Sequence, residues 1–277
     1  MNIKFKNSLY VISAYAISII ISFSNTLYLS RLLETKEFAI YGSILSIALI
    51  LAGVFSYSQA SFMVDGVKTK SLNPLAVNVA SISTIPLFIF LILFYFIGKN
   101  FFNENLQKFT LFIIILVFCN SFKILFINYS RIKSQYKKFL YYYSYDKFCL
   151  LASLIIFIIF KDFEFLIYVY VLLNTFFIIF YFINFKKINL EFLKDKNLVN
   201  TSAYRFFINI IKNIVSIHVL IFLLTSIGEY SLSASITLGM TIFSLITIPL
   251  ALLETFLGPI IAKIFKIKRN FIFEKFV

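Results

Sequence analysis

The chain has 277 residues, of which 61% are hydrophobic and only 14% are charged, and its mean hydropathy is +0.93. A soluble domain is closer to half apolar and a quarter charged. These values therefore exclude an ordinary soluble protein and predict an all-α protein that crosses a membrane several times. The formal net charge of +14 does not require nucleic acid as a partner, because membrane topology accounts for it, as shown below.

Apolar runs of about 20 residues recur along the whole chain, and each is long enough to cross a hydrocarbon core of roughly 30 Å as a helix. The N-terminal segment MNIKFKNS is basic and leads into a run that is too long for a signal peptide, so we expect an uncleaved first span. We predict eight spans, with ends uncertain by a few residues, at 8–30, 38–62, 77–98, 106–128, 140–160, 163–184, 206–226 and 230–257.

Lys and Arg residues are distributed unevenly between alternate loops. If the N-terminus is cytoplasmic, nineteen of the 26 are counted with the inside segments, including Lys147 of the predicted span 140–160. Five lie in outside loops, and Lys123 and Lys212 lie within other spans. Because inside loops are enriched in these residues, we expect both termini in the cytoplasm. Residues 186–205 are expected to form a cytoplasmic linker between six spans in 1–185 and two spans in 206–277.

Polar residues recur at helical spacing on one face of several predicted spans. Charges inside a bilayer are costly unless they face a bundle interior or water, and a rotation of 100° per residue places each set on one stripe. The stripes contain, span by span, Ser18, Ser22 and Asn25; Asn120, Lys123 and Arg131; Arg205, Asn209, Lys212 and Ser216; and Ser233, Thr237, Ser244 and Thr247, with Glu254 near the last stripe.

Each stripe has two interpretations. Ser and Thr alone favour close helix packing, as do Gly42 and Ser46 in the second span. Lys123 and Lys212 favour a central aqueous cavity, because an ammonium group needs water or an anion, although Lys123 could instead extend its side chain to the interface. Arg205 and Arg131 fit either a cavity or an inside-positive anchor.

Three titratable residues in or near the spans have roles that the sequence leaves open. His218 fits a packed, hydrogen-bonded histidine or a proton relay. Glu254 fits an ion-coupling site or an interface charge. Asp146 is interpreted as a topological charge close to basic residues at a helix end.

The sequence contains none of the common catalytic motifs. It has no Walker-type phosphate loop, no H-E-x-x-H, no G-x-S-x-G and no Cys/His cluster. We therefore expect no enzyme activity, no cofactor and no metal site. Cys119 and Cys149 are interpreted as small core residues.

Two motifs resemble a known family. In SRLLETKEFAIYG, residues 30–42, Arg31, Leu32, Leu33, Glu37, Phe38 and Tyr41 match a pattern like A-R-L-L-G-P-x-E-F-G-x-Y, although Glu34 and Thr35 stand where Gly and Pro are usual and Ala39 replaces the second Gly. In IGEYSLSASITLGM, residues 227–240, the pattern G-x-Y-S-x-A-x-x-L is matched by Gly228, Tyr230, Ser231, Ala234 and Leu238. The segment LGPIIAKIF, with Pro259 and Ala262, resembles a third pattern, P-x-x-A.

These motifs are similar to those of O-antigen (Wzx-type) flippases in the multidrug, oligosaccharidyl-lipid and polysaccharide exporter superfamily. The resemblance implies a MATE-like fold of two six-helix lobes around a cationic cavity. It implies ion-coupled movement of an undecaprenyl-diphosphate-linked oligosaccharide across the bacterial inner membrane, beside other polysaccharide-assembly proteins. The family usually has twelve to fourteen spans, so eight would form one lobe and the start of a second. Eight spans fit either an incomplete version of the family or a shorter chain that is active, for example as a dimer.

The resemblance also suggests roles for the polar stripes. Lys212 and Lys123 would bind the diphosphate, with Arg205, Asn209, Ser216, Asn120 and Asn25 beside them, whereas Glu254 and His218 would couple an ion. A drug or cation exporter of the same superfamily would have acidic residues in its cavity. A membrane polymerase or glycosyltransferase would have a long outside loop, and a non-transporting subunit is a further alternative.

Overall fold

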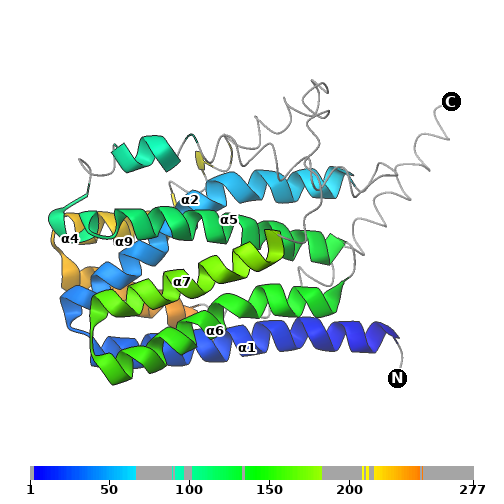
Figure 1. The fold of residues 1–277 in the computed structure, drawn as a ribbon, viewed down its shortest axis with the longest axis horizontal. Helices are drawn as coiled ribbons and strands as arrows, with labels where there is room; N and C mark the ends of the chain where they lie inside the picture. Colours follow the sequence, from blue (N-terminus) through cyan, green and yellow to red (C-terminus); the bar gives the residue numbers. More distant parts are fainter. Residues whose placement is uncertain are drawn as a thin grey trace.

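The computed structural model describes most of the chain as helix (Figure 1). The described residues are 3–66, 89, 91–96, 102–132, 135–182, 208, 210–211, 215–243 and 245. Every regular element in these ranges is a helix, which confirms the predicted all-α class. The elements are α1 (Ile3–Leu32), α2 (Thr35–Gly66), α4 (Glu104–Gln107), α5 (Thr110–Ile132), α6 (Tyr136–Phe160), α7 (Phe163–Phe182) and α9 (Ile217–Ser226), followed by a helix over Tyr230–Phe243.

Four helices contain stretches that are long and apolar enough to cross a membrane. The stretches are Leu9–Leu32, Thr35–Val54, Thr110–Asn128 and Tyr136–Phe160. Shorter apolar stretches cover Phe163–Phe176, Ile217–Ser226 and Tyr230–Phe243. The structure therefore supports a helical, membrane-embedded protein. The number of eight spans and the cytoplasmic location of both termini stay predictions, and residues 186–205 and most of 77–98 lie outside the described residues.

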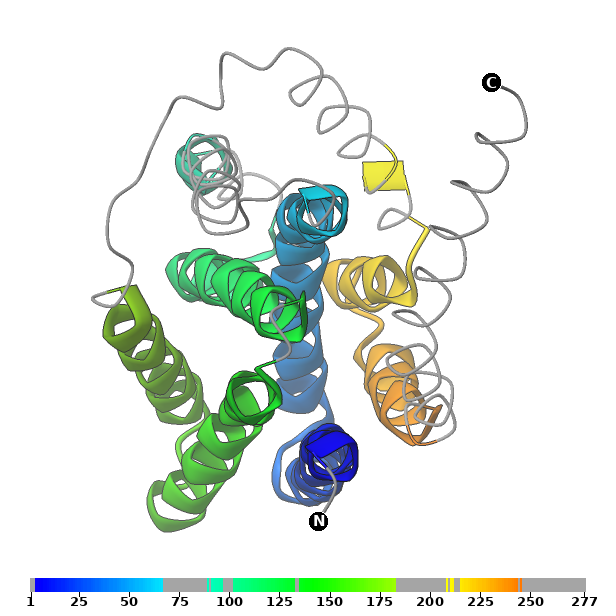
Figure 2. The ribbon, with the colours of Figure 1, turned by 90° about the vertical axis from the view of Figure 1, so that its right-hand side faces the viewer.

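Consecutive long helices run in alternating directions, as successive membrane spans must. α1 and α6 are parallel, because Tyr15 packs on Phe139 with ring centroids 6.2 Å apart and the Ser18 hydroxyl donates to the Tyr143 carbonyl at 3.3 Å. α5 is antiparallel to α6. α2 passes through the middle, with α5 on one side and α9 on the other (Figure 2).

The turn between α1 and α2 is shorter than the stretch of sequence that contains its charged residues, Arg31 to Glu37. Only Leu33 and Glu34 separate the two helices. The Glu34 backbone N–H donates to Glu37 Oε2 at 3.2 Å, and the Phe38 N–H donates to the Glu34 carbonyl at 2.9 Å. Glu37 thus satisfies a free N–H group at the start of α2, which is half of a capping box.

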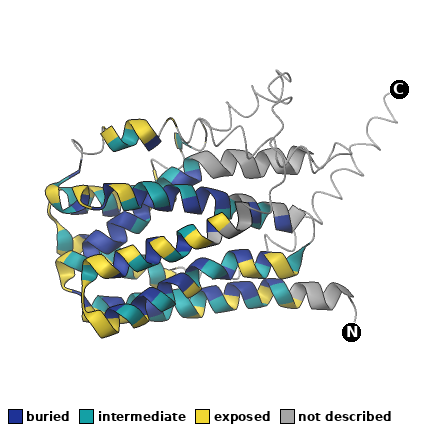
Figure 3. Ribbon diagram, in the orientation of Figure 1, coloured by how far each residue is buried: buried dark blue, intermediate teal, exposed yellow. Residues whose placement is uncertain are grey.

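Residues that face other helices are buried, whereas many on the outer faces are exposed (Figure 3). Both groups contain large apolar side chains. Ile44, Ile113 and Leu166, from three helices, are completely or almost completely buried. Outward-facing Ile20 and Ile159 are 65% and 69% exposed. Large apolar side chains exposed in such number are expected for a surface that contacts lipid rather than water.

The predicted single helix over 206–226 is wrong. Ser216 has extended dihedral angles, φ −78° and ψ 152°, and is the N-cap of α9, which begins at Ile217. Ser is a common N-cap residue, although the Ser216 side chain makes no capping hydrogen bond here. A rotation of 100° per residue therefore cannot be carried through Ser216. The stripe of Arg205, Asn209, Lys212 and Ser216 stays a prediction, because the first three residues lie outside the described residues.

Candidate functional site

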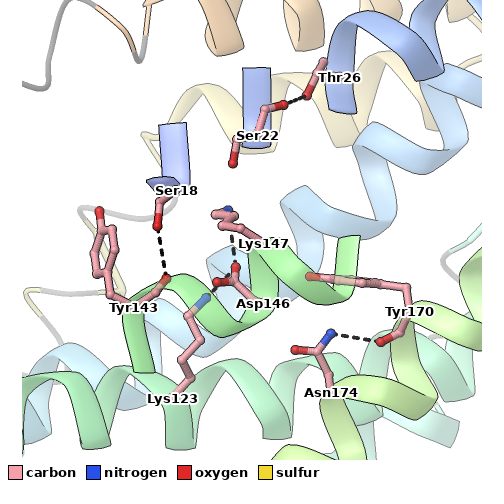
Figure 4. Close-up of polar contacts among 9 residues, drawn as sticks. All are labelled: Ser18, Ser22, Thr26, Lys123, Tyr143, Asp146, Lys147, Tyr170 and Asn174. Carbon is pink, nitrogen blue, oxygen red and sulfur yellow. Dashed lines mark hydrogen bonds and ion pairs between the residues drawn. The ribbon is translucent and has the colours of Figure 1, made fainter. Parts of the chain in front are cut away.

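A cluster of three charged side chains lies inside the helix bundle, at the contact between α5 and α6. Lys123 Nζ of α5 is 2.6 Å from Asp146 Oδ2 of α6. Lys147 Nζ, on the next residue of α6, is 3.2 Å from the same oxygen (Figure 4). We call Lys123, Asp146 and Lys147 the charged cluster.

The charged cluster is largely removed from solvent. The Asp146 side chain is 5% exposed, that of Lys123 15% and that of Lys147 28%. Asp146 Oδ1 is buried and has no hydrogen-bond partner among the described residues. Two ammonium groups thus share one carboxylate oxygen, which leaves one excess positive charge and one unsatisfied acceptor in the bundle.

Asp146 lies well inside α6, so its interpretation as a topological charge at a helix end is wrong. α6 starts at Tyr136, and Tyr142, Asp146 and Cys149 are all buried. Helical spacing places these three residues on one stripe, and Tyr142 contacts Phe126 of α5 with ring centroids 5.5 Å apart. The sequence signal that was missed is the pairing of this stripe with the Lys123 stripe across the short α5–α6 turn.

Two further helices direct polar side chains at the charged cluster. Tyr170 of α7 points toward Asp146, and Ser22 of α1 faces Lys147 (Figure 4). Tyr170 is 4% exposed, and its backbone carbonyl accepts a hydrogen bond from Asn174 Nδ2 at 2.9 Å. Polar groups from α1, α5, α6 and α7 therefore converge on this part of the bundle.

Only some of the residues predicted from the sequence lie near the charged cluster. Asn120 precedes Lys123 by about one turn of α5 and is 6% exposed. Asn25, on the α1 face that contains Ser18 and Ser22, is 1% exposed, and its amide has no hydrogen-bond partner among the described residues. Arg205, Asn209, Lys212 and Glu254 lie outside the described residues.

His218 belongs to a different contact, between α9 and α2, and Ser216 is the N-cap of α9. His218 Nδ1 is 3.1 Å from the Ser46 hydroxyl oxygen, so the predicted hydrogen-bonded histidine is present. The Ser216 hydroxyl is buried and has no partner in the described part of the chain. A role of His218 in ion coupling stays a prediction.

A second polar contact, which we call the hydroxyl junction, lies beside the two motif segments. It consists of Ser43 of α2, Thr225 of α9 and Ser233 of the following helix. The Ser43 hydroxyl donates to Thr225 Oγ1 at 2.5 Å, and Thr225 Oγ1 lies 2.7 Å from Ser233 Oγ. Ser233 and Thr225 also donate to the Ile221 carbonyl, at 3.2 and 3.0 Å.

Gly228 of the second motif terminates α9. Its φ is +90°, which L side chains rarely adopt. The Glu229 N–H donates to the Leu224 carbonyl at 2.9 Å and the Gly228 N–H to the Thr225 carbonyl at 3.2 Å. This pair of bonds is a Schellman motif, which favours glycine at the left-handed position.

Tyr230, the next residue of the second motif, fixes the start of the following helix. Its hydroxyl oxygen accepts a hydrogen bond from Asn105 Nδ2 at 3.1 Å. Lys36 Nζ, at the start of α2, lies 5.8 Å from the centre of its ring. The matched motif residues thus hold helix ends together, which is a structural task.

No protein-family model, curated protein or solved structure matches this chain. The family resemblance therefore rests on the residues of the motifs. Within the described ranges, no group of three His, Cys, Asp or Glu residues could hold a metal ion.

Proposed function

We propose that this protein moves a lipid-linked oligosaccharide with a diphosphate headgroup across a bacterial inner membrane. The observation that carries the proposal is the contact between the two motif segments. Residues 30–42 and 227–240 are far apart in the chain, yet Gly42 lies against Thr237 and Lys36 Nζ lies 5.8 Å from the centre of the Tyr230 ring. Segments that resemble one family at two distant points, and that pack on each other, favour a shared helix arrangement over a chance match.

The charged cluster supports the same substrate. A diphosphate headgroup needs fixed positive charge inside the membrane, and the cluster has two ammonium groups for one carboxylate. The predicted roles of Lys212, Arg205 and Asn209 in headgroup binding, and of Glu254 in ion coupling, belong to this proposal. The MATE-like lobe arrangement belongs to it as well.

The proposal is tested by surface display of polysaccharide. The chain is expressed in a panel of strains that lack their own flippase and differ in repeat unit. We expect display to be restored in at least one strain. Lys147→Ala should reduce display at least about tenfold, the scale expected for a lost charge-assisted bond, at unchanged protein level.

Lys108→Ala is the matched control, because Lys108 is exposed and its ion pair with Glu164 is a loose 3.9 Å. This variant should display polysaccharide as the unaltered chain does. Absence of display in every strain, despite normal membrane insertion, would contradict the proposal.

One observation favours a second candidate, an exporter of organic cations in the same superfamily. Asp146 places a carboxylate inside the bundle, as such an exporter would need, and no described residue hydrogen-bonds its second oxygen. The two lysines outnumber it, so the sign of the local charge favours an anionic substrate. Resistance to cationic dyes in a drug-sensitive strain, abolished by Asp146→Asn, would support the exporter instead.

A further inference from the structure

We propose that the charged cluster is a diphosphate-binding site in which Asp146 is an internal counter-ion that the ligand displaces. Lys147 and Lys123 would bind the diphosphate, and Asp146 would hold them in place while the site is empty. The inference takes its ligand class from the proposed function and adds where the headgroup binds. Neither Lys147 nor Asp146 stands out in the sequence as a substrate residue.

The net charge of the charged cluster indicates which class of ligand it would bind. Burial of an unbalanced charge is costly, and removing one partner of a buried ion pair is strongly destabilising. The charged cluster has an excess positive charge and few routes to solvent, since only Lys147 is more than a quarter exposed. An anion completes the balance, whereas a metal cation would be repelled by two ammonium groups.

The hydrogen bonds leave donors for that anion. An ammonium group has three N–H donors, and Asp146 Oδ2 is the only carboxylate oxygen that either lysine contacts among the described residues. Asp146 Oδ1 accepts no hydrogen bond from the part of the chain that the structure describes. A purely structural ion pair usually satisfies its buried polar atoms, so the spare donors and the unused oxygen indicate a site built to exchange partners.

The arrangement of the helices gives the three residues different tasks. Lys147 is the most exposed member and extends toward α1, where Ser22 faces it (Figure 4). Lys123 lies deeper, at the shortest distance to Asp146. The ligand would therefore contact Lys147 first, and Asp146 acts as a positioning residue that competes with the ligand for both ammonium groups.

If Asp146 competes with the ligand, Lys147→Gln and Asp146→Asn should change the affinity for diphosphate in opposite directions. Purified protein in detergent is titrated calorimetrically with inorganic pyrophosphate and, separately, with farnesyl diphosphate. Lys147→Gln should weaken binding about tenfold or more, since a charge-assisted hydrogen bond is lost. Asp146→Asn should tighten binding about tenfold, because the competing carboxylate is removed. Lys108→Gln, at an exposed ion pair, should leave affinity unchanged.

A merely structural role predicts something else. In that case Asp146→Asn and Lys147→Gln would both weaken binding or leave it unchanged, and either result with folded protein would overturn the proposal. If Asp146→Asn does not fold, Lys147→Gln is compared with Lys147→Arg, which keeps the positive charge: weakened affinity in the first and retained affinity in the second support the proposal, and equal affinities overturn it. Tighter binding of farnesyl diphosphate than of pyrophosphate supports a lipid headgroup, equal binding supports a free diphosphate, and no binding of either overturns the site.

The outcome is separable from that of the proposed function. Diphosphate binding that depends on Lys147, in a chain that restores no polysaccharide display, would support the site and contradict the flippase. Restored display in a chain whose diphosphate binding does not depend on Lys147 would support the flippase and contradict the site.

Discussion

Gly42 of α2 lies so close to the helix over Tyr230–Phe243 that a Cβ atom there would come within 2.5 Å of Thr237 Oγ1. It would also lie 3.2 Å from Thr237 Cβ, which side-chain rotation cannot move away. Small residues at helix contacts in membranes allow this close approach. Gly42 therefore sets the distance at which the two motif segments meet.

Gly42→Ala should destabilise the protein by about 1–3 kcal/mol, because the added methyl group overpacks the contact. Gly239→Ala is the matched control, since nothing lies within 4 Å of a Cβ atom there. That variant should be about 0.5–1 kcal/mol more stable, because glycine weakens a helix. Thermal unfolding in detergent measures both, and equal effects of the two substitutions would contradict the close approach.

The roles of single residues were predictable from the sequence where spacing within one helix indicates them, whereas the identity of a partner on another helix was not. The packing roles of Gly42, Ser18 and Ser46 follow from small polar residues at helical spacing, and the contacts confirm them. Lys123 was recognised as needing water or an anion. Its anion is Asp146 of the next helix. Spacing within one helix does not connect the two residues; only the pairing of their two stripes, which depends on how α5 packs on α6, does so.

At the scale of elements, the end of α9 is determined by Gly228. The residue holds φ +90° and the Schellman bonds, so the direction of the following helix depends on it. Apolar runs and charged turns predicted the long helices to within a few residues in most cases. The break at Ser216 was not predicted, because the apolar run continues through it and only the N-cap preference of serine marks the site.

Gly228→Ala should destabilise the α9 turn by about 1–2 kcal/mol, the cost of a left-handed conformation for a residue with a Cβ atom. Gly228→Asn should cost less, because asparagine tolerates this region better. The same detergent unfolding measurement ranks the variants. An alanine variant as stable as the asparagine variant would show that the positive φ is not needed.

At the scale of the whole molecule, α2 joins two groups of helices. On one side it contacts α5, which carries Lys123 of the charged cluster, and on the other it contacts α9 through the hydroxyl junction. Composition and apolar periodicity predicted an all-helical membrane protein, because both depend on the bilayer rather than on particular contacts. The side-by-side placement of the motif segments depends on long-range packing, which periodicity does not contain.

Transport by the purified chain is the most direct test of the proposed flippase activity. The protein is reconstituted into vesicles that contain a polyprenyl-diphosphate-linked oligosaccharide, and the fraction of sugar accessible to an external glycosidase is followed over time. We predict that wild-type protein moves the lipid between leaflets. Lys147→Ala should slow this movement at least about tenfold, whereas Lys108→Ala should not. Vesicles with correctly inserted wild-type protein that exchange the lipid no faster than protein-free vesicles would contradict the proposed activity.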